Sequence, residues 1–242
     1  MIDDVLGRLR LGGELSVLEV GCGTGILAVP IAGRCSRFVG LDFAERALAV
    51  LDRRLHEQGL SHKATVVCGD FLSMPQAELD SLGLFDRVLV YSALHYAADD
   101  DQAQEFLRRA VGRVRPGGFV FFGNLPLGEL QEEIATIKQA TGATRARRLM
   151  RWVWTAQGPV PRTVTWKVRS LPHRAWRGLR RSVRRPAFDP QRLPPRSTVR
   201  LRIENLERWL ASMPGVTGYQ WLAPRVGTPM YMWSADLLVR AG

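Results

Sequence analysis

The sequence predicts an α/β fold in which helices cover both faces of a mostly parallel β-sheet. Strand-like and helix-like patterns alternate over the first 123 residues. A short run of apolar, β-prone residues leads directly into a glycine-rich turn in residues 17–25, VLEVGCGTG, and an apolar helical pattern follows. Parallel strands need crossover helices, and these crossovers are right-handed, so the alternation predicts a doubly wound sheet.

Five strands are expected in this first part of the chain, each marked by a short apolar or β-branched run. They comprise residues 16–20, 37–41, 64–68, 85–91 and 119–123. Three helices are expected between them, at residues 25–32, 44–58 and 100–114, where apolar residues recur at helical spacing. The third helix is expected to end at the Pro-Gly-Gly of residues 116–118, because proline and glycine stop helices.

A helix at residues 203–213 and strands at 218–222 and 230–239 are expected near the C-terminus, which brings the sheet to seven strands. Before them, residues 124–199 break the alternating rhythm, and a helical pattern covers residues 127–157. We therefore predict one α/β domain made of residues 1–123 and 200–242, with residues 124–199 as a basic, partly helical insert after the fifth strand.

The composition narrows the class of protein. With 242 residues, 46% of them hydrophobic, the chain can bury a large core. No uninterrupted run of about 18 apolar residues occurs, so no transmembrane helix is expected. The first residues, MIDD, lack the basic start and apolar stretch of a secretory signal. Because Cys22, Cys35 and Cys68 lack metal-ligand spacing, we expect free thiols, no metal site and a cytoplasmic location.

The positive charge is concentrated in one segment. Residues 143–202 contain 17 Lys and Arg but a single acid, Asp189, whereas the rest of the chain contains 17 basic and 22 acidic residues. Residues 171–184 form an amphipathic pattern of apolar residues and arginines, and four tryptophans lie in the same segment: Trp152, Trp154, Trp166 and Trp176.

Four interpretations of this basic segment stay open. In the first, the segment attracts an acidic acceptor or a phosphate, since arginine binds such groups bidentately. In the second it lies on an anionic membrane surface, and in the third it contacts a nucleic-acid backbone. In the fourth it is a solvated lid that binds nothing specific.

Five motifs in this order resemble the class I S-adenosylmethionine-dependent methyltransferases, in their small-molecule, type 11/12-like branch. Besides VLEVGCGTG they are residues 40–42 (GLD), 69–71 (GDF), 85–86 (FD) with 91–95 (YSALH), and 115–118 (RPGG). The resemblance covers residues 14–123 and, more loosely, 200–242. A nicotinamide-binding protein would instead carry Gly-x-Gly-x-x-Gly. The resemblance implies a Rossmann-like sheet and S-adenosylmethionine as the cofactor.

The resemblance also implies a set of cofactor-binding residues: Glu19, Gly21, Gly23, Gly25, Asp42, Phe43, Asp70, Phe71 and Tyr91. The glycines would let the methionine part of the cofactor approach the main chain, and Glu19 would face its ammonium group. Asp42 would accept both ribose hydroxyls, because a carboxylate has two acceptor oxygens.

The remaining implied contacts surround the adenine and the sulfonium. Phe43 would lie on one face of the adenine, Asp70 would accept from its amino group with Phe71 beside it, and Tyr91 and Ser92 would frame the sulfonium. Each acid also has a purely structural interpretation. Glu19 could pair with a backbone amide, Asp42 could cap the helix that follows it, and Asp70 could cap a turn.

The resemblance implies methyl transfer to an oxygen or nitrogen of a small, acidic or sugar-like metabolite. Because an oxygen nucleophile needs a base, His95, just beyond the fourth strand, is the candidate catalytic residue, although a histidine there could simply pack. Tyr96 and Asn124 are weaker candidates for orienting the acceptor. The alternative is a methyltransferase, or a catalytically silent protein of the same fold, that acts on RNA or at an anionic membrane through residues 143–202. The sequence does not predict the oligomeric state.

Overall fold

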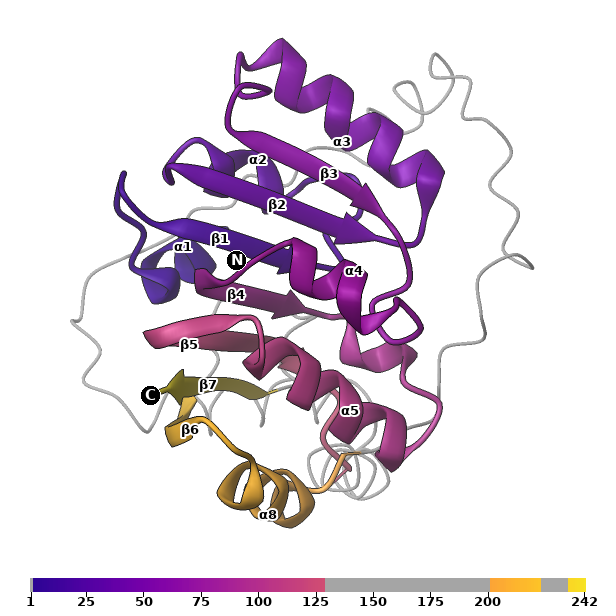
Figure 1. Ribbon diagram of the computed structural model, residues 1–242, viewed down its shortest axis with the longest axis vertical. Coiled ribbons are helices and arrows are strands. Elements are labelled where there is room, and N and C mark those ends of the chain that lie inside the picture. Colours follow the sequence, from indigo (N-terminus) through magenta and orange to yellow (C-terminus); the bar gives the residue numbers. More distant parts are fainter. Residues whose placement is uncertain (1, 129–200, 223–234) are drawn as a thin grey trace, which may run out of the picture.

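A computed structural model describes residues 2–128, 201–222 and 235–242. Within these residues, the chain forms a seven-stranded sheet of order β3-β2-β1-β4-β5-β7-β6 (Figure 1). Among these strands β7 alone runs opposite to the other six, so the prediction of a mostly parallel, seven-stranded sheet is confirmed. The strands are β1 (Ser16–Val20), β2 (Arg37–Asp42), β3 (Ala64–Cys68), β4 (Phe85–Tyr91), β5 (Val114–Leu125), β6 (Val216–Leu222) and β7 (Ala235–Ala241).

Helices pack on both faces of this sheet through two separate apolar clusters. One cluster includes Leu79, Leu107 and Leu206 from one set of helices, and the other includes Leu9, Ile31 and Leu51 from a second set. The sheet is therefore doubly wound, as predicted. The first set is α4 (Gln76–Ser81), α5 (Asp100–Val111) and α8 (Ile203–Ser212), and the second is α1 (Ile2–Leu9), α2 (Ala28–Ala32) and α3 (Glu45–Glu57).

The central strand and the longest helix of the first face show why these residues adopt this fold. All five residues of β1 are buried, and Val17 and Leu18 belong to the clusters on opposite faces, as the alternation of a strand requires. Helix α5 begins with a reciprocal cap. The Asp99 carboxylate accepts from the Gln102 N–H, and the Gln102 side chain accepts from the backbone N–H of Ala98.

Two predicted helix boundaries are wrong, and glycine conformation explains the first. The first helix starts at Ala28 rather than at residue 25, because Gly25 has a φ of +88°, which a right-handed helix cannot contain. Helix α5 ends at Val111, before the Pro-Gly-Gly, which belongs to β5. A Cβ on Gly118 would lie 2.6 Å from the carbonyl oxygen of Asp86, so this glycine lets β5 pair closely with β4.

The predicted insert falls largely outside the described residues. Strand β5 continues to Leu125, two residues beyond its expected end. Leu127 then pairs with Leu201, and the N–H of Gly128 donates to the Leu201 carbonyl at 2.8 Å. The two ends that flank residues 129–200 therefore lie side by side, at Leu127 and Leu201. Residues 129–200, which include the segments expected to be helical or amphipathic, and residues 223–234 lie outside it. No helix within the described ranges is long and apolar enough to cross a membrane.

Candidate cofactor and active site

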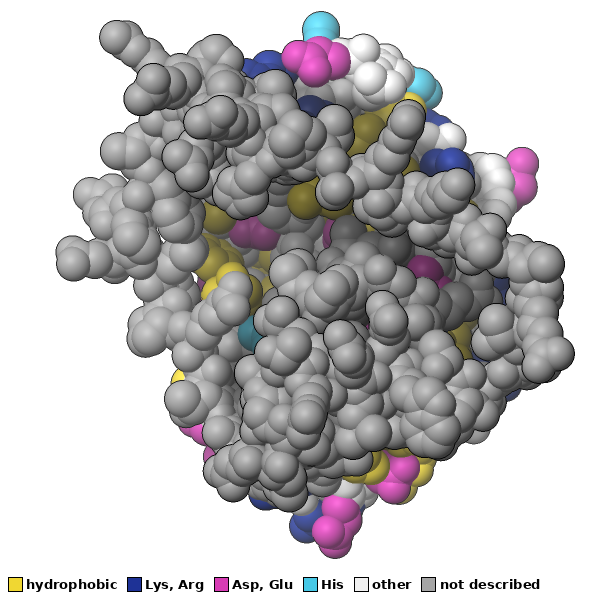
Figure 2. Space-filling model, turned by 180° about the vertical axis from the view of Figure 1, so that it is seen from behind, with side chains coloured by type: hydrophobic (Ala, Val, Ile, Leu, Met, Phe, Trp, Pro, Cys, Tyr) yellow, Lys and Arg dark blue, Asp and Glu magenta, His cyan; other side chains and the backbone are white. Residues whose placement is uncertain are grey.

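A cavity of about 580 Å³ opens at the carboxyl ends of β1, β2 and β4. The sheet order reverses between β1 and β4, and open α/β sheets bind ligands at such a switch point. Figure 2 shows the molecule from behind, hollowed near its centre, with hydrophobic and acidic side chains exposed in the hollow. Seven of the nine predicted cofactor residues line the cavity: Gly21, Gly23, Asp42, Phe43, Asp70, Phe71 and Tyr91.

The glycine turn after β1 forms one wall of this cavity. Gly21 and Gly23 have φ values of +78° and +52°, which favour glycine. A Cβ on Gly21 would lie only 3.0 Å from the Cβ of Ala93, so the turn needs a residue without a side chain there. Gly25 lies outside the cavity lining and packs against Leu51 of α3, so its contact with the cofactor stays a prediction.

Asp42, the last residue of β2, fixes this turn relative to α3. Its Oδ2 accepts from the backbone N–H of Gly23 at 2.8 Å, and its Oδ1 accepts from the N–H of Ala44 at 2.9 Å. The side chain therefore has the structural role that the sequence allowed, and it also borders the cavity. Each carboxylate oxygen can accept a second hydrogen bond, so Asp42 retains capacity for a ligand.

Glu19 lies behind the turn rather than in the cavity lining. Only 3% of the residue is exposed, and its Oε2 has no hydrogen-bond partner in the part of the chain that the structure describes. Burial, and then the nearby charge of Asp42, raise the pKa of Glu19 well above its usual range. Burial thus disfavours the charged form of Glu19, and a cation beside it would favour the carboxylate.

Aromatic side chains and Asp70 form the opposite side of the cavity. Phe43 is 45% exposed and meets the ring of Tyr96 edge-on, with centroids 6.0 Å apart. Phe71 is buried and packs against Phe106 of α5 at 4.8 Å. Asp70 is exposed, and its Oδ1 accepts from the N–H of Leu72 at 3.1 Å, which leaves its other oxygen for a ligand.

The third side of the cavity lies beyond β4 and β5. Tyr91 packs so closely on Gly123 that a Cβ there would overlap its ring. Ser92 also lines the cavity, and its Oγ accepts from the side-chain amide of Asn124 at 2.6 Å. The backbone N–H of Asn124 donates in turn to Asp236 of β7 at 2.9 Å. Burial raises the pKa of Asp236, against the opposing effects of that N–H and of Arg8.

His95, the candidate base, lies on a short 3₁₀ helix, η1 (Leu94–Tyr96), that follows β4. It is half-buried and lies outside the cavity lining, whereas its neighbours Tyr96 and Ala97 form part of that lining. The structure therefore brings Tyr96, but not His95, to the cavity wall. The catalytic role of His95 stays a prediction.

Asp86, part of the fourth motif, lies at the amino end of β4, away from the cavity. It accepts hydrogen bonds from the N–H and the hydroxyl of Ser16 at 2.7 and 2.6 Å. Although burial opposes it, these bonds and Arg115 hold the pKa of Asp86 below its usual value. This residue joins β1 to β4 and has a structural role.

The sequence analysis missed two residues that support the site, Asp236 and Arg109. Asp236 is the one acid in β7, a mostly apolar strand, and this is the one signal that could have drawn attention to it. Arg109 belongs to a run of charged residues on α5 and carries no sequence signal.

The fold and the cavity define a ligand-binding α/β domain of the class I methyltransferase type, and the comparisons with known proteins agree. Residues 17–118 match the family described as methyltransferase domain. A ubiquinone biosynthesis O-methyltransferase from Thiobacillus denitrificans is 35% identical over 118 residues, which cover 49% of this chain and 47% of that protein. The protein of the same name from Bordetella bronchiseptica is 35% identical over 131 residues, half of each chain. The chain thus spans about half the length of the curated relatives it matches.

A solved structure also has a similar fold. Magnesium protoporphyrin IX methyltransferase from Synechocystis PCC 6803, solved with bound S-adenosylhomocysteine, has a TM-score of 0.54 and 15% identity. It covers 99% of this chain and 81% of its own, and at this identity it shows the fold alone. The match over residues 17–118 and the half-length relatives together support a class I S-adenosylmethionine-dependent methyltransferase domain in this part of the chain.

Proposed function

We propose that this protein transfers a methyl group from S-adenosylmethionine to an oxygen of a small molecule. The observation that carries the proposal is Asp42, held by Gly23 and Ala44 at the edge of the cavity with acceptor capacity to spare. A diol such as that of ribose matches two carboxylate oxygens. The names of the curated relatives, which are O-methyltransferases, support oxygen as the methylated atom.

The residues present fit the proposed cofactor. The cavity volume, about 580 Å³, lies in the range of small-molecule sites. Phe43 and Phe71 offer aromatic surface for a base, and Asp70 offers an acceptor for its amino group. Glu19, with one buried oxygen that has no partner among the described residues, supplies a negative charge for an ammonium group near the glycine turn. Together these groups match a ligand in which a nucleoside is joined to an amino acid.

The chain's own residues would then position the reactants. When bound, S-adenosylmethionine supplies a methyl group that is already activated by its positively charged sulfur, so alignment supplies much of the acceleration. The Ser92 oxygen accepts from Asn124, which leaves the hydroxyl proton free to donate to an acceptor in the cavity. His95 is our candidate for the group that takes the acceptor's proton, because an imidazole changes protonation near neutral pH.

For the acceptor we propose a small acidic or sugar-like metabolite, since the 17 basic residues of segment 143–202 would attract an anion. The same charge favours a second candidate, an RNA or an anionic membrane surface. We also propose a cytoplasmic location, which suits the three free cysteines Cys22, Cys35 and Cys68.

Transfer of labelled methyl from S-adenosylmethionine to a cell extract tests the proposal. The extract is separated into small metabolites, lipids and RNA after the reaction. We expect the label among the small metabolites, in a product whose methyl is bound to oxygen. Label confined to lipid or RNA would favour the second candidate, and no transfer to any fraction would contradict a methyltransferase activity.

A further inference from the structure

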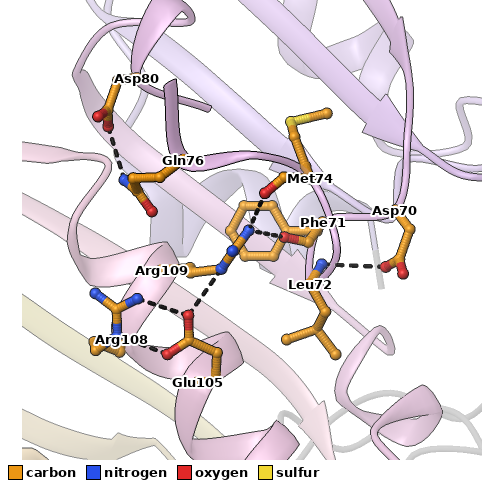
Figure 3. A network of polar contacts seen from close by, with 9 residues as sticks. All are labelled: Asp70, Phe71, Leu72, Met74, Gln76, Asp80, Glu105, Arg108 and Arg109. Carbon is orange, nitrogen blue, oxygen red and sulfur yellow. Dashed lines mark hydrogen bonds and ion pairs between the residues drawn. The ribbon is translucent and has the colours of Figure 1, made fainter. Parts of the chain in front are cut away.

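Helix α5 holds the loop that follows β3 through one arginine. The Nη1 of Arg109 donates to the backbone carbonyls of Phe71 and Met74, each at 2.8 Å, and its Nε donates to Glu105 at 2.9 Å (Figure 3). The Arg109 side chain is 12% exposed. A planar guanidinium presents its donors in a fixed fork, so these bonds define both the position and the orientation of the loop backbone.

Further contacts link the position of Asp70 to the two carbonyls that Arg109 binds. The N–H of Met74 donates to the carbonyl of Asp70 at 2.8 Å, and the Asp70 carboxylate accepts from Leu72. The two carbonyls that Arg109 binds therefore lie within the same turn as Asp70. Phe71 packs on Phe106, which lies three residues before Arg109 on the same helix. Figure 3 shows Asp70 and Phe71 beside this network.

Arg109 itself does not belong to the cavity lining, whereas Asp70, Phe71 and Leu72 do. An ionised carboxylate only accepts hydrogen bonds. Asp70 can therefore distinguish a base that presents an amino group from one that presents a carbonyl oxygen, provided that its position is fixed.

We propose that Arg109 is a positioning residue that sets the base preference of the cofactor site, an inference that rests on the proposed function. By binding the carbonyls of Phe71 and Met74, Arg109 holds the Asp70 carboxylate where it meets the amino edge of adenine. Without the arginine the turn loosens, and Asp70 moves to accommodate either base. Affinity for an adenosyl compound then falls more than affinity for its inosyl counterpart.

The chain offers a matched control one residue away. Arg108 lies on the same helix and binds the same Glu105, at 2.6 Å, but its side chain is 55% exposed and no contact in the described part joins it to the loop. Arg108→Ala removes the same charge and a bond to Glu105 while leaving both loop carbonyls bound by Arg109.

Calorimetry on the full chain measures affinity for S-adenosylhomocysteine and for S-inosylhomocysteine, in which oxygen replaces the adenine amino group. We expect the wild-type chain and Arg108→Ala to prefer the adenosyl compound by about tenfold or more, the effect of one hydrogen bond to a charged group. We expect Arg109→Ala to reduce this preference to less than about threefold, while both compounds still bind. Arg109→Lys should have an intermediate preference, because one ammonium does not reproduce the fork.

The outcomes separate this inference from the proposed function. If Arg109→Ala binds both compounds more weakly by the same factor, the arginine is merely structural and the inference is wrong. If Arg109→Ala does not fold, Arg109→Lys provides the test. A preference of Arg109→Lys for the adenosyl compound equal to that of the wild-type chain contradicts the inference. A wild-type chain that binds both compounds equally also contradicts it. A wild-type chain that binds neither compound contradicts the proposed function itself.

Discussion

The side-chain amide of Asn124 donates a hydrogen bond to the hydroxyl of Ser92 at 2.6 Å, and both residues have a positive φ, 58° and 59°. They lie at the carboxyl ends of two neighbouring parallel strands. A residue other than glycine in this conformation costs about 1 kcal/mol or more. Such residues persist where the surrounding structure enforces the conformation, and they are often found at functional sites. The pair therefore fixes the backbone at Ser92, which lines the cavity.

Replacing Asn124 by glycine tests the role of this pair. Glycine tolerates the positive φ, so we expect the free energy of unfolding to stay within about 1 kcal/mol of the wild-type value. Because Ser92 loses its partner, we expect kcat to fall about tenfold and the affinity for S-adenosylhomocysteine to change little. Asn205→Ala, at a half-buried asparagine of α8 outside the cavity lining, is the control. An unchanged kcat in Asn124→Gly would show that the pair only shapes the backbone.

Gly123 offers a test of the cavity wall. A Cβ at this position would overlap the ring of Tyr91, which lines the cavity, whereas a Cβ on Gly218 of β6 would meet nothing within 4 Å. We expect Gly123→Ala to push the Tyr91 ring toward the cavity and to weaken S-adenosylhomocysteine binding about tenfold or more. Gly218→Ala should bind as the wild-type chain does. Equal affinities in the two variants would place the bound cofactor away from Tyr91.

Glu19 is expected to make stability depend on pH. Burial raises its pKa in the folded chain, so at pH values between the unfolded and the folded pKa the folded state binds a proton that the unfolded state has released. The stabilising effect of this proton is complete below the unfolded pKa, and it is lost as pH rises toward the folded value.

Glu19→Gln removes this titration and keeps a polar group of similar size. We therefore expect the variant to gain stability relative to the wild-type chain as pH rises above the usual pKa of a glutamate, measured by urea denaturation at several pH values. The matched control is Glu14→Gln, at an exposed glutamate. A difference between Glu19→Gln and the wild-type chain that stays constant with pH would mean that Glu19 is ionised in the folded chain.

The sequence predicted the strands of the first half closely and some helix ends poorly, for physical reasons. Strands 64–68 and 85–91 match β3 and β4 because turns bound their apolar runs. Helix α4 was not predicted, since its six residues bury only Leu79 and rely on packing against the sheet. The first predicted helix starts late because Gly25 has a positive φ, and Gly25 packs against Leu51, 26 residues away, which local sequence patterns do not reveal.

The site likewise contains residues that could be predicted from the sequence and residues that could not. Asp42, Asp70 and the glycines follow strands directly, so their place at the cavity could be predicted from the order of the elements. The supporting contacts could not, because they join distant residues: Asn124 meets Asp236 across 112 positions, and Arg109 meets Phe71 across 38. Gly25 was predicted to contact the cofactor because it shares a motif with Gly21 and Gly23, but only packing shows that it faces Leu51.

The most direct test of the account is calorimetric titration of S-adenosylhomocysteine into the wild-type chain and into Asp42→Asn. The amide retains one acceptor oxygen for the glycine turn but loses the charge and one acceptor, so we expect affinity to fall at least about tenfold. Asp52→Asn, at an exposed position of α3, should bind as the wild-type chain does. Wild-type binding that survives unchanged in Asp42→Asn, or a wild-type chain that gives no heat with S-adenosylhomocysteine, would contradict the account.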